Sequence, residues 1–255
     1  VRLAEGSSAV IIDTSTAHRT LDDWTYGFPE VRGLREKIRT SKRIANPGCH
    51  ASGFISLVAP LVSEGLISPE TYLTAASLTG YSGGGKKMIA QYEADERDPL
   101  LDAPRQYGIT QAHKHLPEMK KVCGLYNEPA FMPIVADFYS GMEVTVPVFS
   151  KDIKGTMSDI RECYADYYKE GLVRFIENAD EAGFLSAGAL AERVLTLPPF
   201  ARISREDYRL LLRHLIETEH IQRTEEGNLI PTPAVGCSQT WIDLADKVIV
   251  ELNLR

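Results

Sequence analysis

The stretch "IANPGCHASGF", residues 44–54, places a cysteine directly after Pro-Gly, where a strand pattern gives way to a helix pattern. Residues 43–45 read as a short β-strand, Pro-Gly as a tight turn, and residues 51–64 as an apolar helix. This order predicts Cys49 at or just before a helix N-terminus, where N–H groups and the macrodipole favour a thiolate. The same amides can donate to an oxyanion on an attacked carbonyl. From position alone, a buried and inert thiol is an equally good reading.

Strand and helix patterns alternate on both sides of this turn. Strands are expected at residues 9–13, 43–45, 72–78, 131–138 and 143–149. Helices are expected at residues 31–40, 51–64, 117–124 and 156–170, the last opened by Thr156 with Asp159 as a near capping box. The run "GMEVTVPVF" alternates apolar and polar residues, as in an antiparallel sheet with one wet side. The alternation predicts an α/β fold with a mixed sheet.

Two segments carry further structural expectations. Residues 9–13 form an apolar run typical of a strand inside a parallel sheet, with other strands before and beside it, so the chain reads as beginning partway through a domain. Residues 95–108 contain Pro99 and Pro104 and no periodic pattern, so we expect a structureless active-site loop there.

The composition restricts the function classes. The chain has 255 residues, 44% hydrophobic content and a formal net charge of −7, which is typical of a globular protein and argues against nucleic acid as its main partner. No apolar run reaches the length of a membrane span, so no membrane partner is expected. The four cysteines, at 49, 123, 163 and 237, form no CxxC pair. Their spacing fits neither a zinc site nor a disulfide framework, and it predicts reduced thiols, no metal and a cytoplasmic location.

A second motif, "AHKHLPEM" at residues 112–119, contains paired histidines and a carboxylate. In a strand His113 and His115 share a face, and Pro117 then opens a helix with Glu118 in its first turn. Such a set suits a general base whose tautomer is held by a carboxylate. Alone the pair is slightly more often structural, and as a metal half-site it lacks further ligands. Together with Cys49 it reads as a separated nucleophile–base system.

The third motif is "TGYSGGGKK", residues 79–87, between an expected strand and a lysine-bearing helix. Its glycines allow backbone amides to approach an anion, and Lys86 adds positive charge. It is neither GxGxxG nor a P-loop, and a flexible turn is the more common meaning of a glycine run.

The fourth motif, "DTSTAHRT" at residues 13–20, follows the first expected strand. Asp13, Ser15 and Arg19 then lie at the carboxyl end of that strand, where open α/β sheets bind ligands. Arg19 either holds a phosphate or carboxylate, or forms an ion pair with Asp13.

In combination, "NPGCHASGF", "TGYSGGGKKMIAQYE", "HKHLPEM" and "PIVADFYSGMEVTVPV" resemble, in that order, the N-acetyl-gamma-glutamyl-phosphate reductases of arginine biosynthesis, in the branch with a shortened chain. The resemblance covers residues 1 to about 187. It implies a remnant of a Rossmann-type NADP-binding domain at residues 1–48. It also implies a mixed-sheet catalytic and dimerisation domain at residues 49–187, similar to that of glyceraldehyde-phosphate dehydrogenase, an atypical tail at 188–255, and a homo-oligomer.

The same resemblance implies a reaction and roles for residues. The Cys49 thiolate attacks an acyl phosphate and expels phosphate, NADPH gives hydride to the thioester, and the semialdehyde leaves. His115, with His113, is the implied acid/base, oriented by Glu118. The implied cofactor-binding residues are Ser82, Gly83, Gly84 and Ser15, and the implied substrate-binding residues are Arg19, Asn46 and Lys86.

The chain also departs from this family. The family's first strand and glycine-rich pyrophosphate turn are not found, which predicts weak activity or none. Residues 203–227, with Ser204 as expected N-cap and Asp207 behind it, resemble a winged-helix-like piece of a helicase-related protein. Residues 227–253 resemble the acetyl-CoA hydrolase/CoA-transferase family. A composite or fragmentary chain is our interpretation, and a Cys/His hydrolase or acyltransferase without a redox cofactor, or a non-catalytic fragment, are the alternatives.

Overall fold

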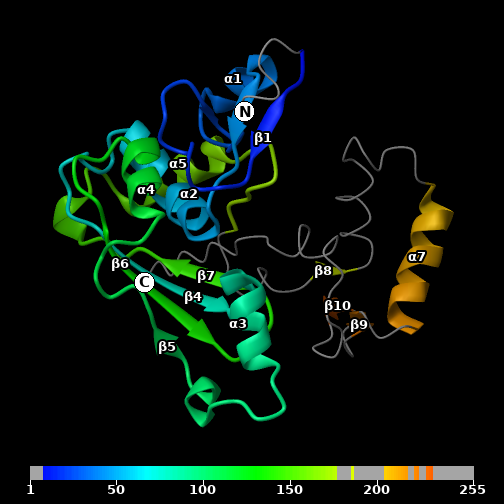
Figure 1. Cartoon of the computed structure of the whole chain (residues 1–255). Helices are drawn as coiled ribbons and strands as arrows, with labels where there is room; N and C mark the ends of the chain where they lie inside the picture. Colours follow the sequence, from blue (N-terminus) through cyan, green and yellow to red (C-terminus); the bar gives the residue numbers. More distant parts are fainter. Residues whose placement is uncertain (1–7, 177–184, 187–203, 218–220, 224–227, 232–255) are drawn as a thin grey trace. The chain divides into compact units, whose positions relative to one another are not determined.

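The computed structural model describes residues 8–176, 185–186, 204–217, 221–223 and 228–231. The described residues fall into two compact units, the first containing residues 8–176 and the second the described residues from 185 to 231 (Figure 1). Residues 8–176 contain every motif of the reductase resemblance. The expected boundaries at 48 and 187 stay predictions.

A small parallel sheet opens the first unit. Its strands, in spatial order, are β1 (Ile11–Asp13), β3 (Arg43–Ala45) and β2 (Thr25–Tyr26), and the helix α1 (Leu34–Thr40) precedes β3. The expected parallel pairing of the first strand is confirmed, and among the described residues β1 is an edge strand that pairs with β3 alone, which leaves Ile12 64% exposed. The expectation of further strands beside it stays a prediction.

A four-stranded mixed sheet forms the centre of the first unit. In spatial order its strands are β5 (Arg105–Gln106), β6 (Ala130–Ala136), β4 (Thr74–Gly80) and β7 (Met142–Thr145). Strands β4 and β6 are parallel from the pair Thr74↔Ala130 to the pair Gly80↔Ala136, whereas β5 and β7 pair antiparallel. The predicted α/β fold with a mixed sheet is therefore confirmed.

The helices α2 (Cys49–Ser63) and α4 (Leu116–Cys123) pack on one face of this sheet, and α5 (Met157–Tyr167) packs against α2 (Figure 1). The largest core cluster joins Phe54 of α2 and Met119 of α4 to Phe131 of β6. Thr156 and Asp159 form the predicted capping box at the start of α5. The sequence between β4 and β5 forms the 3-10 helix η2 (Tyr81–Gly84), the helix α3 (Gly85–Tyr92) and the 3-10 helix η3 (Pro99–Asp102). A further 3-10 turn, η4 (Ser150–Asp152), precedes α5.

The expectation of a structureless segment at 95–108 is wrong. Besides η3 and β5, the segment is held by Arg97, which forms ion pairs with Asp102 at 2.5 Å and Asp137 at 2.6 Å. Leu101 is buried there against Tyr92 and Val135. Local composition gave no sign of Asp137 and Val135, because these two partners lie more than 30 positions away.

The second unit contains β8 (Leu185–Ser186), α7 (Arg205–Glu217), β9 (Ile221–Arg223) and β10 (Asn228–Pro231), with the strands in the antiparallel order β8-β10-β9. The predicted cap of α7 is confirmed, since the Asp207 N–H donates to Ser204 Oγ at 3.1 Å. Cys237 lies outside the described residues, and so does the segment that resembles CoA-transferases except for Asn228–Pro231. Among the described helices, none has the length and apolar character that crossing a bilayer requires.

Candidate active site

Cys49 is the first residue of α2 and is exposed, with Gly48 as the N-cap residue. The prediction of a thiol at a helix N-terminus is confirmed, and the alternative of a buried thiol is wrong for this residue. The first N–H groups of a helix have no intrahelical acceptor, so the end of α2 that carries Cys49 has a partial positive charge. By contrast, Cys123 is buried, which raises its pKa, and burial raises the pKa of Cys163 to about 11.

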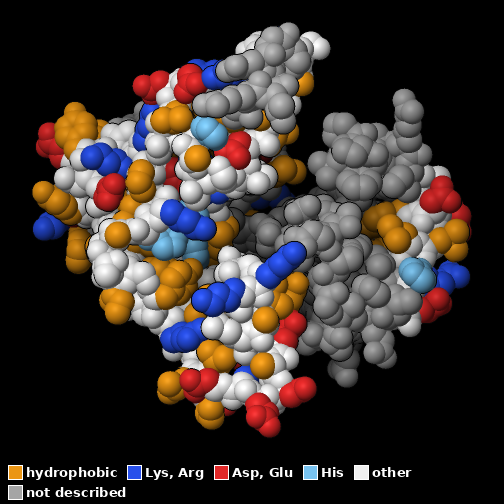
Figure 2. Space-filling view, viewed as in Figure 1, with side chains coloured by type: hydrophobic (Ala, Val, Ile, Leu, Met, Phe, Trp, Pro, Cys, Tyr) orange, Lys and Arg blue, Asp and Glu red, His pale blue; other side chains and the backbone are white. Residues whose placement is uncertain are grey.

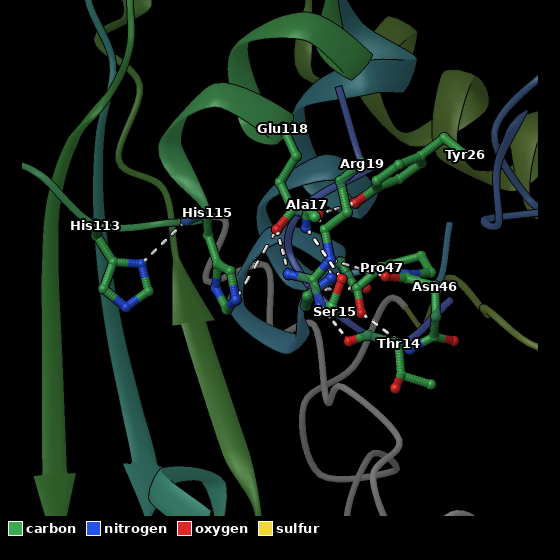
Figure 3. Close-up of polar contacts among 12 residues, drawn as sticks. Thr14, Ser15, Ala17, Arg19, Tyr26, Asn46, Pro47, His113, His115 and Glu118 are labelled. Carbon is green, nitrogen blue, oxygen red and sulfur yellow. Dashed lines mark hydrogen bonds and ion pairs between the residues drawn. The ribbon is translucent and has the colours of Figure 1, made fainter. Parts of the chain in front are cut away.

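Glu118, in the first turn of α4, holds the turn that presents Cys49 (Figure 3). Its side chain is fully buried, and its Oε2 accepts hydrogen bonds from the Gly48 N–H at 3.1 Å and the Tyr26 hydroxyl at 2.7 Å. Its Oε1 accepts a hydrogen bond from Arg19 Nη1 at 2.9 Å. One carboxylate oxygen therefore fixes the residue before the cysteine, and the other holds Arg19. The burial of Tyr26, with the Glu118 charge beside it, raises the pKa of that phenol, so it remains a donor.

Arg19 contacts the same turn and connects three segments of the chain. Besides Glu118, its Nε donates to the carbonyl of Asn46 at 2.9 Å and its Nη2 to that of Thr14 at 3.4 Å. The expected alternative, an Arg19–Asp13 ion pair, is wrong: Asp13 pairs with His18, with 2.6 Å between carboxylate and imidazole. The Asn46 N–H donates to the Asp13 carbonyl at 2.8 Å, and the Asn46 side chain is exposed. The Arg19 guanidinium therefore donates to three acceptors of the protein itself.

His115 packs directly on the cysteine turn. A Cβ added to Gly48 would lie 2.4 Å from His115 Nε2 and 2.6 Å from Arg19 Nη1, so only glycine fits there. The Nδ1 atom of His115 is buried and has no hydrogen-bond partner. Burial first, and then neighbouring His50 and His113, lower the pKa of His115 to about 2, so the ring is neutral.

Two expectations about the paired histidines need correction. His113 and His115 do not lie on a strand; they occupy the turn before α4, where the His115 N–H donates to His113 Nδ1 at 3.3 Å. The rings still meet, with centroids 4.7 Å apart. Glu118 does not orient His115 through a hydrogen bond, since Oε1 and Nε2 are 3.9 Å apart and the carboxylate is occupied by other donors.

Sequence reasoning missed a buried polar chain behind the cysteine. His50 is 3% exposed, with Nδ1 2.7 Å from Ser77 Oγ and Nε2 2.8 Å from the Tyr107 hydroxyl. Ser77 donates in turn to the Glu143 carbonyl at 3.1 Å. Burial lowers the pKa of His50 to about 4; burial, together with the Cys49 charge, raises the pKa of Tyr107 to about 12. One sequence signal could have found this buried chain, namely that His50 directly follows Cys49. Because consecutive residues at the start of a helix point in different directions, an exposed Cys49 leaves His50 to point elsewhere.

The remaining predicted site residues lie at two other places. Ser15 belongs to the turn after β1, where its hydroxyl donates to Asp13 at 2.7 Å and accepts from the Ala17 N–H at 3.2 Å. Ser82, Gly83 and Gly84 lie in η2 at the carboxyl end of β4, followed by the exposed Lys86 on α3. The Ser82 N–H donates to the Tyr139 carbonyl at 2.9 Å, which ties this loop to the turn between β6 and β7.

Histidine surface gathers in the middle of the face shown in Figure 2, bordered by Lys and Arg side chains. Three rings, those of His50, His113 and His115, lie with centroids 4.7–5.8 Å apart. Within the part of the chain that the structure describes, no group of three or more His, Cys, Asp or Glu side chains has the arrangement of a metal site. The chemistry available here is that of a thiol, neutral imidazoles and helix amides.

Residues 49–191 match the profile of the family described as semialdehyde dehydrogenase, dimerisation domain. The chain belongs to this semialdehyde dehydrogenase family. The matched region begins at Cys49 and contains the mixed sheet, α2 and α4.

Two curated relatives of this chain are both named as N-acetyl-gamma-glutamyl-phosphate reductases. The chain is 39% identical over 191 residues to the N-acetyl-gamma-glutamyl-phosphate reductase of Rhizobium meliloti (strain 1021), covering 73% of this chain and 62% of that protein. It is 38% identical over 176 residues to N-acetyl-gamma-glutamyl-phosphate reductase 2 of Nostoc sp., covering 66% of this chain and 55% of the relative. The chain therefore spans between 55% and 62% of the length of these relatives. The aspartate semialdehyde dehydrogenase of Francisella tularensis shares the fold, with a TM-score of 0.50 at 15% identity over 74% of this chain and 64% of that one.

Proposed function

We propose that the chain carries out the reduction of N-acetyl-glutamyl 5-phosphate to N-acetyl-glutamate 5-semialdehyde, with NADPH as reductant and release of phosphate. The observation that carries this proposal is the exposed Cys49 at the start of α2, with a neutral, buried His115 packed on the preceding glycine. The names of the curated relatives support the choice of substrate. Cys123 and Cys163, which form no disulfide among the described residues, support a cytoplasmic location.

Cys49 supplies the nucleophile of the proposed reaction. Its thiolate attacks the carbonyl carbon of the acyl phosphate, and the first-turn amides of α2 stabilise the resulting oxyanion. The carbon–oxygen bond to phosphate then breaks and leaves a thioester on Cys49. Sulfur serves this step better than a hydroxyl, because it is nucleophilic near neutral pH and is also a good leaving group.

His115 moves the proton in this scheme. As a neutral imidazole it accepts the proton of the Cys49 thiol, and it then gives that proton to the departing phosphate. Its low pKa in the free protein keeps the ring unprotonated but also makes it a weak base. The negative charge of a bound phosphate stabilises the imidazolium, which raises the pKa while the substrate is present.

The loop after β4 offers a contact for the reactive end of a nicotinamide cofactor. The exposed glycines 83 and 84, after the half-buried Ser82, leave backbone accessible at the carboxyl end of β4, where open sheets bind ligands. We assign Ser82, Gly83 and Gly84 to this contact. We assign Ser15, after β1, to the cofactor side as well, and Lys86 and Asn46 to the acyl phosphate. A cofactor bound there would supply the hydride that reduces the thioester, and Cys49 would then be the leaving thiolate.

The test is NADPH oxidation in the presence of phosphate-activated N-acetylglutamate, with Cys49→Ser as the matched control. Loss of NADPH absorbance that requires the acyl phosphate and disappears in C49S supports the reductase. Turnover of esters or thioesters without NADPH would establish a hydrolase or acyltransferase instead. If the protein shows neither activity, the reductase motifs serve only as a structural scaffold.

A further inference from the structure

We infer that Arg19 and Glu118 form a charge-balanced pair that sets the acidity of the Cys49 thiol through the Gly48 turn. This inference rests on the proposed role of Cys49 as nucleophile. It assigns Arg19 and Glu118 as positioning residues. The expected roles were substrate binding for Arg19 and orientation of the imidazole for Glu118.

The geometry places one charge of each sign against the turn that precedes the cysteine. The side chains of Arg19 and Glu118 are 8% and 1% exposed, and their ion pair is 2.9 Å long. Glu118 also accepts the Gly48 N–H, one residue before Cys49, and Arg19 donates to the carbonyl of Asn46, three residues before it. An uncompensated charge in such a buried position acts on a neighbouring ionisation far more strongly than a charge in water.

Other titratable groups of the described residues lie around the site. They are His50 of α2, His113, Lys114 and His115 of the turn before α4, Tyr107 after β5, Tyr26 of β2, and Asp13 with His18 at the end of β1. Burial lowers the pKa of His50, His113 and His115, and it raises the pKa of both tyrosines, so these five groups are neutral near pH 7. Besides the buried ion pair, the charges near the site are therefore those of Lys114, whose side chain is exposed to solvent, and of Asp13, which pairs with His18.

The sign of each perturbation follows. Removal of the Glu118 charge leaves the Arg19 cation unbalanced, which favours the thiolate and lowers the pKa of Cys49. Removal of the Arg19 charge leaves the carboxylate unbalanced and raises that pKa. Removal of both charges restores the balance.

The experiment measures the alkylation rate of Cys49 by iodoacetamide between pH 5 and 9, followed by mass spectrometry of the peptide that contains it. In the full chain, we expect Glu118→Gln to lower the apparent thiol pKa by about one unit and Arg19→Gln to raise it by about one unit. Below the pKa, each shift changes the rate roughly tenfold. The double variant R19Q/E118Q should return to within a few tenths of a unit of the parent protein.

Tyr26→Phe is the matched control, because it removes one hydrogen bond to the same carboxylate without changing a charge. Its thiol pKa should equal that of the parent protein. A shift in Y26F as large as that in E118Q, or an E118Q variant whose thiol pKa is unchanged or raised, overturns the inference. If R19Q fails to fold because a buried carboxylate is left unpaired, E118Q still decides the sign, since glutamine keeps the shape and an acceptor oxygen.

The alkylation rates of the cysteines in the parent protein distinguish a failure of this inference from a failure of the proposed function. If Cys49 reacts no faster than Cys163 after correction for exposure, the nucleophile assignment itself fails. If Cys49 is the faster thiol but the two charge variants shift its pKa in the same direction, only the charge-pair inference fails.

Discussion

At the scale of single residues, the site is built around imidazoles kept neutral by burial. His115 has a pKa of about 2 and His50 a pKa of about 4, both depressed chiefly by desolvation. In the unfolded chain both rings titrate near 6.5. Between those values the unfolded state binds protons that the folded state does not, so acid favours unfolding.

The free energy of unfolding should therefore fall as pH decreases from 6.5 toward 4. Each of these histidines contributes a slope of up to about 1.4 kcal/mol per pH unit in that window. The variant His115→Gln removes one titrating group, so its slope should be smaller by roughly 1 kcal/mol per pH unit. Urea denaturation at pH 7, 6 and 5 measures this difference. Parallel pH profiles for the variant and the parent protein would contradict it.

At the scale of one element, α2 contains a proline at an interior position without losing its hydrogen-bond balance. Pro60 has no N–H, so the carbonyl of Ser56, four residues earlier, lacks its helical donor. The Tyr168 hydroxyl, in the turn after α5, donates to that carbonyl at 2.7 Å. The Tyr164 hydroxyl donates to the neighbouring Leu57 carbonyl. The tyrosine hydroxyls at the end of α5 and just after it therefore compensate for the proline and stabilise the helix that carries Cys49.

The variant Tyr168→Phe should destabilise the protein by about 1–2 kcal/mol, because the buried Ser56 carbonyl loses its donor. In a Pro60→Ala background the residue-60 N–H supplies the missing helical bond, so the same tyrosine substitution should have a much smaller effect. Urea denaturation of the two single variants and the double variant measures the coupling. Equal effects of the tyrosine substitution in both backgrounds would show that the hydroxyl does not serve this carbonyl.

At the scale of the whole molecule, the four-stranded sheet has two unlike faces. Strand register places Ala76 beside Met132 and Leu78 beside Ile134 on the face opposite α2 and α4. These side chains are only partly buried, and Met132 is 36% exposed, whereas their sequence neighbours Ala75 and Phe131 lie in the core. Because the family is described as a dimerisation domain, we propose that a second copy of the chain covers this face.

The variant Met132→Glu should weaken such a homo-oligomer, since it places a charge in the centre of the apolar face. Light scattering coupled to size-exclusion chromatography should then report a smaller mass for the variant than for the parent protein. Glu128→Lys, also a charge change but before β6, is the control. An unchanged mass in Met132→Glu would exclude this face as the contact between copies.

The sequence by itself determined the local features of this protein. The change of period around Pro47-Gly48 predicted a strand, a turn and a helix with Cys49 at its start, and the structure confirmed all three. The capping residues Thr156 and Ser204 were equally readable, because a cap depends on side chains within three positions. The order of the motifs was sufficient to indicate the family.

Only the tertiary structure decided which partners those residues have. The Arg19–Glu118 pair joins positions 99 apart, and the Tyr168–Ser56 bond joins positions 112 apart, so neither follows from local spacing. The burial of His50 and the exposure of β1 likewise depend on which segments pack against them. Sequence pattern specifies which groups a short segment presents, but the electrostatics of Cys49 depend on charges brought together by the folded chain.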